Sequence, residues 1–167
     1  MMDIKNVTSV IRNEISKEEF LQKNAIQSEQ VPEIFSSALT NAYNNHDWQL
    51  VEYSLIFSFV YGIYPKQSGN ILCKLILEDW HYQHENIALN LKEQKNPATV
   101  NCLFEAAQKK FEYLDYDDTF QLANKCISAL GAIRDNIAIE KLNLLMKSKN
   151  KIIAEYATNE IERKWGL

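Results

Sequence analysis

Four carboxylates and two tyrosines lie within one seven-residue segment of the sequence. The segment reads Glu112-Tyr113-Leu114-Asp115-Tyr116-Asp117-Asp118. Acidic side chains steer a basic partner toward its site, and a tyrosine offers a large, rigid contact area with a polar tip. The segment therefore predicts a protein-binding surface that includes Glu112, Asp115, Tyr116, Asp117 and Asp118.

A local structural role would explain the same residues. In that interpretation Asp118 caps the following helix, Leu114 and one tyrosine pack beneath the segment, and the remaining side chains are solvated. Calcium binding is a third possibility, but the segment lacks the glycine and the final bidentate glutamate of an EF-hand loop. The sequence leaves the solvated connection and the partner surface open.

Two histidines form a second candidate group. His81 and His84 are three residues apart, so one helical face could present both, with Glu78 and Glu85 nearby as further metal ligands. A helical zinc site, however, commonly uses histidines four apart and a third ligand, and His46 is remote in sequence. We expect no bound metal and hydrogen bonds from the histidines to nearby carbonyls or carboxylates. The edge of the partner surface is predicted to include Trp80, His81, His84 and Glu85.

No arrangement typical of catalysis accompanies these groups. Serine, cysteine and histidine do not occur in the nucleophile motifs of hydrolases, and no glycine-rich phosphate loop is present. We therefore expect a protein that is not an enzyme and needs no cofactor.

Charge and hydropathy argue against nucleic acid and membrane as partners. The net charge is −4 and the sequence has no run rich in lysine and arginine. The most apolar run, Tyr53 to Tyr64, is shorter than the roughly 20 residues of a membrane helix and ends at Pro65. Its aromatic side chains are expected in the core, and no secretory signal is visible at the start.

The three cysteines indicate a reducing compartment. Cys73, Cys102 and Cys126 are odd in number, far apart and each within an apolar helical stretch. We expect them to be small core residues of a cytoplasmic protein.

Helical periodicity runs through almost the whole chain, and only 4 Gly and 3 Pro occur in 167 residues. Three helix starts are marked by capping residues: a capping box at Ser16–Glu19, an aspartate at Asp47, and the pair Asn96-Pro97. A second helix is predicted to begin at the capping box, after a first near 7–15. Further helices are predicted near 32–44, 47–64, 71–79, 81–93, 97–111, 119–131, 136–147 and 150–165.

The last helices repeat a pattern. Leu122-Ala123, Cys126 and Leu130 match Ile153-Ala154, Ala157 and Ile161, each 31 residues further on. The helices that precede these two, which begin near Val100 and Ile139, match at an offset of 39 residues. The segment 112–118 accounts for most of the difference between the offsets of 39 and 31. Leu130 is therefore predicted to be buried between two helix pairs.

The run 122–133, which ends in Ala129-Leu130-Gly131-Ala132-Ile133, resembles HEAT-like repeats, as does its continuation at 138–142. The resemblance implies an all-α fold: a short right-handed α-solenoid of stacked antiparallel helix pairs, forming one domain over 1–167. Residues 66–167 match more clearly than 1–65. Asp135-Asn136 stands where the family often has a proline.

Segments 77–85 and 113–118 also look like those of small bacterial HEAT-like proteins, some of which are immunity proteins against toxins. The resemblance thus implies a non-catalytic scaffold that binds another protein, for example a basic toxin domain. The alternatives are an adaptor in a larger assembly and a HEAT-type enzyme, such as a DNA-base glycosylase or a pigment lyase. The oligomeric state is left open.

Overall fold

The computed structural model describes residues 4–166, and every regular element within that range is a helix. The longer helices are α2 (Lys17–Lys23), α3 (Val31–Asn45), α4 (Trp48–Tyr61), α5 (Gly69–Leu75), α6 (His84–Gln94), α7 (Val100–Ala106), α8 (Gln121–Ile133), α9 (Asn136–Leu145) and α10 (Lys151–Trp165). The remaining elements are a short helix α1 (Thr8–Ile11) and five 3-10 turns. These turns are η1 (Ile4–Val7), η2 (Ser28–Gln30), η3 (Lys66–Ser68), η4 (Pro97–Thr99) and η5 (Glu112–Leu114). The predicted all-helical class is confirmed.

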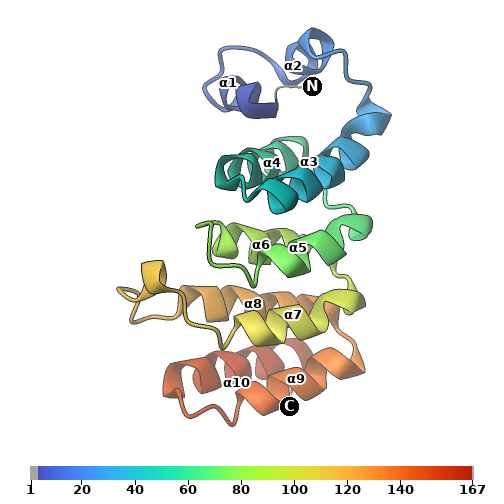
Figure 1. Ribbon diagram of the computed structural model, residues 1–167. Coiled ribbons are helices and arrows are strands. Elements are labelled where there is room, and N and C mark those ends of the chain that lie inside the picture. The colour runs from blue at the N-terminus through green and yellow to red at the C-terminus, as the bar shows by residue number, and fades with distance from the viewer. Residues whose placement is uncertain (1–3, 167) are drawn as a thin grey trace.

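Consecutive helices pack as pairs, and the pairs lie one below another in chain order (Figure 1). Helix α3 pairs with α4, α7 with α8, and α9 with α10. Helix α8 also packs on α6 and on α10, so the second helices of the last three pairs form a continuous row. This row places the connection 107–120 at one edge of the molecule.

Side-chain caps fix the starts of several helices. The Ser16 hydroxyl accepts from the Glu19 amide while the Glu19 carboxylate accepts from the Ser16 amide, which confirms the predicted capping box. The side chains of Asp47 and Asn96 likewise accept from backbone amides at the starts of α4 and η4. These caps satisfy amides that have no partner within the helix.

Several predicted boundaries are wrong. The first helix ends at Ile11, whose side chain is 55% exposed, because Asn13 turns the chain with a φ of 57°. Helix α7 ends at Ala106 rather than near Phe111, which is extended and buried.

The core is apolar and continuous from Val7 to Ile161. Leu130 is completely buried, as predicted from the repeat. In the aromatic run, Phe57 is fully buried but Phe59 is 37% exposed, so that run is only partly core. None of the helices within residues 4–166 combines the length and apolar character needed to cross a membrane.

A disulfide joins Cys73 of α5 to Cys102 of α7, across two neighbouring helix pairs. Their Cα atoms are 5.4 Å apart, and 29 residues separate them in sequence. The prediction of three unbridged core cysteines is therefore wrong for this pair, and these cysteines no longer argue for a reducing compartment. Cys126 is free and buried, and burial raises the pKa of its thiol.

Candidate protein-binding surface

The connection between α7 and α8 projects from one edge of the molecule (Figure 1). Phe111 anchors it, being 5% exposed, and Tyr113 and Leu114 are half-buried against the core. The prediction that Leu114 and one tyrosine pack beneath the segment agrees with these positions. Tyr116, by contrast, is 83% exposed, the largest exposed fraction among the exposed apolar and aromatic residues of the described chain.

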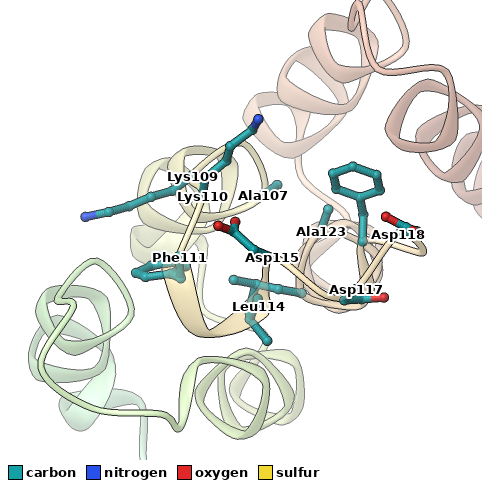
Figure 2. Close-up of a pocket in the computed structure, with 11 residues that line it drawn as sticks. Ala107, Lys109, Lys110, Phe111, Leu114, Asp115, Asp117, Asp118 and Ala123 are labelled. Atoms are coloured by element: carbon teal, nitrogen blue, oxygen red, sulfur yellow. The ribbon is translucent and has the colours of Figure 1, made fainter.

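A pocket of about 250 Å³ opens between this connection and the start of α8 (Figure 2). Its apolar wall is formed by Phe111, Leu114, Phe120 and Leu122. Asp115, Asp117 and Asp118 also line it. Lys109 and Lys110 also line it, but their side chains extend outward (Figure 2). The pocket thus combines an apolar interior with an acidic rim.

Asp117 holds the start of α8. One of its carboxylate oxygens accepts from the Thr119 amide at 2.9 Å and from the Thr119 hydroxyl, and the other accepts from the Gln121 amide at 2.7 Å. The hydrogen bonds from Thr119 and Gln121 lower the pKa of Asp117. The sequence had indicated Asp118 as the cap of this helix, and that prediction is wrong, because Asp117 makes these hydrogen bonds. Asp117 therefore has a structural role.

The remaining acidic residues of the segment do not cap a helix. Glu112, Asp115 and Asp118 are exposed, and within the described part of the chain they form no ion pair. Their charges therefore face solvent beside the pocket and Tyr116. Glu85 differs, because its carboxylate pairs with Lys125 of α8 across the α6–α8 contact.

His81 and His84 are both completely buried. The expectation that they contact a partner is corrected by this burial, which leaves them no accessible surface. Nor do they lie on one helix, because α6 begins at His84. The His81 side chain bonds to backbone groups on both sides of the turn before α6. Its Nδ1 accepts from the Gln83 amide, and its Nε2 lies 2.8 Å from the Leu75 carbonyl oxygen.

The two imidazoles stack with their centroids 4.4 Å apart. His84 Nε2 lies 2.6 Å from the Glu78 carbonyl oxygen, and Nδ1 lies 2.7 Å from the Tyr113 hydroxyl. A neutral ring that donates through Nε2 and accepts at Nδ1 satisfies both contacts. Burial lowers the pKa of both histidines, that of His84 to about 4, so both rings are neutral near pH 7. The predicted hydrogen bonds to carbonyls are thereby confirmed.

Trp80 extends this ring contact to the next connection along the edge. Its indole meets the His46 ring edge-on at 5.0 Å and the His81 ring at 5.1 Å. On the other side, the His84 ring lies 3.8 Å from that of Phe111. The rings therefore link three successive inter-helix connections and position the acidic segment. Trp80 is half-buried, so its predicted contact with a partner is confined to its exposed part.

Sequence reasoning missed Tyr82. Its side chain is 62% exposed and its ring packs edge-on against Tyr113 at 5.1 Å. Tyr82 lies in the turn before α6, where the sequence predicted a helix. The segment from Trp80 to Glu85 was expected at the edge of the partner surface, but Tyr82 was not named among its contacts. We define the acidic tyrosine edge as Tyr82, Glu112, Asp115, Tyr116 and Asp118.

Comparison of the chain with protein-family models, with curated proteins and with solved structures finds no match. Within residues 4–166, no three histidine, cysteine or acidic side chains are grouped as a metal site would require.

Proposed function

We propose that the chain is a non-catalytic scaffold of the HEAT type, a short right-handed α-solenoid, that binds a basic protein through its acidic tyrosine edge. A bacterial immunity protein that neutralises a basic toxin is the concrete form. The observation that carries the proposal is the pocket beside that edge, with its apolar interior and acidic rim.

The pocket suits the side chain of an arginine or lysine from the partner. Such a side chain has an apolar stem, which would pack on Phe111 and Leu114, and a cationic tip, which would reach Asp115 or Asp118. Tyr116 supplies the aromatic contact that dominates many protein interfaces, and its exposure leaves it free to do so.

A non-catalytic role is supported by the state of the groups that could do chemistry. Both nitrogens of His81 and of His84 have hydrogen-bond contacts in the interior, and the free thiol of Cys126 is buried. Asp117 is engaged as a helix cap.

The experiment isolates the partner from the native host with the wild-type chain and measures association by surface plasmon resonance at two salt concentrations. Asp115→Asn/Asp118→Asn should slow association and reduce its salt dependence, because screening acts over about 10 Å in 0.1 M salt. Tyr116→Ala should mainly accelerate dissociation, by about tenfold if the tyrosine is a central contact.

The matched control is Glu155→Gln/Glu162→Gln, which removes the same charge from exposed positions of α10. If that control slows association as much as the edge variant does, the effect is one of net charge. If neither edge variant alters either rate, the partner binds elsewhere and the proposal is wrong.

A further inference from the structure

A second groove, of about 530 Å³, lies where α6, α8 and α10 end. Its cationic residues are Lys92 and Lys95 from the end of α6, Arg134 from the end of α8 and Lys164 from the end of α10. The connections that follow α6 and α8 lie at the edge opposite the segment 112–118 (Figure 1). The groove is therefore separate from the acidic tyrosine edge.

These four cations have no anionic partner within the described part of the chain. Lys125, Arg12 and Arg163 each form an ion pair there, but none is formed by the four cations of the groove. Glu93 is the one carboxylate among the lining residues, and it forms none either. Four unpaired positive charges on a chain of net charge −4 mark this groove as the place for an anion.

The cations also lie close enough to act on one another. Desolvation and the positive charges of Arg163, Arg134 and Lys92 lower the pKa of Lys164, and the negative charge of Glu160 only partly opposes them. A bound anion would relieve this repulsion. One cation at a helix C-terminus is ordinary because it complements the helix dipole, but here three helix ends contribute to one groove.

The backbone at two of these positions would favour glycine. Lys95 and Arg134 are the caps that end α6 and α8, with φ values of 48° and 58°. A left-handed cap is usually glycine, because a side chain is strained there. Both positions carry a cation instead, so glycine can replace each cation without straining the backbone.

We propose that this groove binds an anion with two or more adjacent phosphate groups. Cations from three helices surround a single space, so they suit a compact ligand that concentrates several negative charges. Separate carboxylates, each with a single charge, would fit less well. Lysine and arginine are the residues that commonly bind phosphate oxygens. The site is independent of the protein-binding function proposed for the opposite edge.

Inorganic tripolyphosphate is the probe, and isothermal titration calorimetry of the full chain is the measurement. Lys95→Gly/Arg134→Gly removes two charges and suits the left-handed caps, so thermal stability should be kept or raised. Affinity for tripolyphosphate should fall about tenfold or more, since hydrogen bonds to charged groups are the strong ones. Glu93→Gln should tighten binding about two- to threefold, as the removal of one repulsive surface charge predicts.

Two controls accompany these variants. Asn13→Gly places glycine at an exposed left-handed position remote in sequence, and Lys147→Ala removes an exposed charge outside the groove. Neither should change the affinity more than twofold, a change expected of a distant charge.

A nucleoside triphosphate, tested beside tripolyphosphate, identifies the source of the phosphates. Equal affinities mean that the phosphates alone are recognised, and a tighter nucleotide means that its base also contacts the groove; both support the proposal. The proposal is overturned if tripolyphosphate does not bind, if citrate binds equally well, or if Lys95→Gly/Arg134→Gly has no more effect than the controls.

Discussion

The carboxylate of Glu160 in α10 occupies the space that a Cβ atom would fill at Gly131 in α8. Glu160 is 7% exposed, and Arg163 donates to both of its carboxylate oxygens, at 2.8 Å and 2.7 Å from Nη2. Glycine inside a helix destabilises it by roughly 0.5–1 kcal/mol relative to alanine. The absence of a side chain at Gly131 is thus what allows the buried Glu160 carboxylate, which pairs with Arg163 of the same helix, to pack against α8.

Gly131→Ala should therefore destabilise the protein despite the better helix propensity of alanine. The added methyl group would displace a buried carboxylate, and overpacking of this kind costs about 1–3 kcal/mol. Urea unfolding measures the loss. In a Glu160→Ala background the same change should be neutral or stabilising by up to about 1 kcal/mol. An equal loss in both backgrounds would mean that Glu160 is not the obstacle.

The Cys73–Cys102 disulfide should be detectable by counting thiols. Without reductant, the unfolded chain should show one reactive thiol, that of Cys126, and after reduction it should show three. A bridge that closes a loop of this length stabilises the folded state by about 3–4 kcal/mol in the chain-entropy treatment.

Cys73→Ser/Cys102→Ser should consequently unfold at lower urea than the oxidised wild type, and reductant should no longer affect it. The Cys126→Ala variant serves as the control, because it keeps the bridge. Three reactive thiols in unreduced protein would contradict the bridge.

The sequence predicted those features that depend on neighbouring residues. The caps at Ser16, Asp47 and Asn96 use side chains within three positions of the amides that they bind. Helical periodicity is equally local, so the helices were recognised and Leu130 was correctly placed in the core. A hydrogen bond from a side chain to a backbone group outside the helix is not visible in such a pattern. The His81 side chain makes bonds of this kind, and α6 begins at His84 rather than at His81 as predicted.

Features that depend on how helix pairs stack could not be read from the chain. Cys73 and Cys102 meet because α5 lies beside α7, and only the register between those pairs brings them together. The basic groove likewise draws Lys92, Arg134 and Lys164 from three helices. The lack of lysine- and arginine-rich runs argued against a nucleic-acid partner, and the groove gave no signal in the sequence because its cations come from three separate helices. The acidic segment was visible, since its charges are contiguous.

Leu130→Ala should lower the free energy of unfolding by roughly 2–5 kcal/mol, as large-to-small changes in a core do. Leu130 is fully buried in α8, which packs against α6, α7, α9 and α10. Equilibrium urea unfolding is again the measurement. Leu144→Ala is the matched control, because Leu144 of α9 is 52% exposed and its truncation should cost well under 1 kcal/mol. Similar losses for the two leucines would contradict the packing described for α8.

Acid should destabilise the protein through the stacked histidines. In the folded protein the pKa of His84 is lowered to about 4 and that of His81 is also lowered, chiefly by burial, from an ordinary value of 6.5. The unfolded chain therefore binds protons below pH 6.5 that the folded chain does not. Stability should be constant with respect to these groups above pH 6.5. It should then fall by up to about 1.4 kcal/mol per pH unit per histidine, and for His84 level off near pH 4.

The measurement is urea unfolding from pH 7.5 to pH 4, with the histidine ring signals followed by NMR in the folded state. His84→Gln should be less stable at pH 7 but should lose less stability on acidification, because one of the two titrating groups is gone. His46→Asn is the control, because it removes an exposed histidine outside the stacked pair, and asparagine tolerates the left-handed φ of 49° at this position. Tyr113 donates to His84 in the neutral state, and on protonation His84 Nδ1 becomes a donor, so this hydrogen bond should reverse, with the Tyr113 hydroxyl oxygen accepting. The NMR signals of the Tyr113 ring should therefore shift as His84 titrates near pH 4, and a Tyr113 signal that is unchanged across that titration would contradict this hydrogen bond.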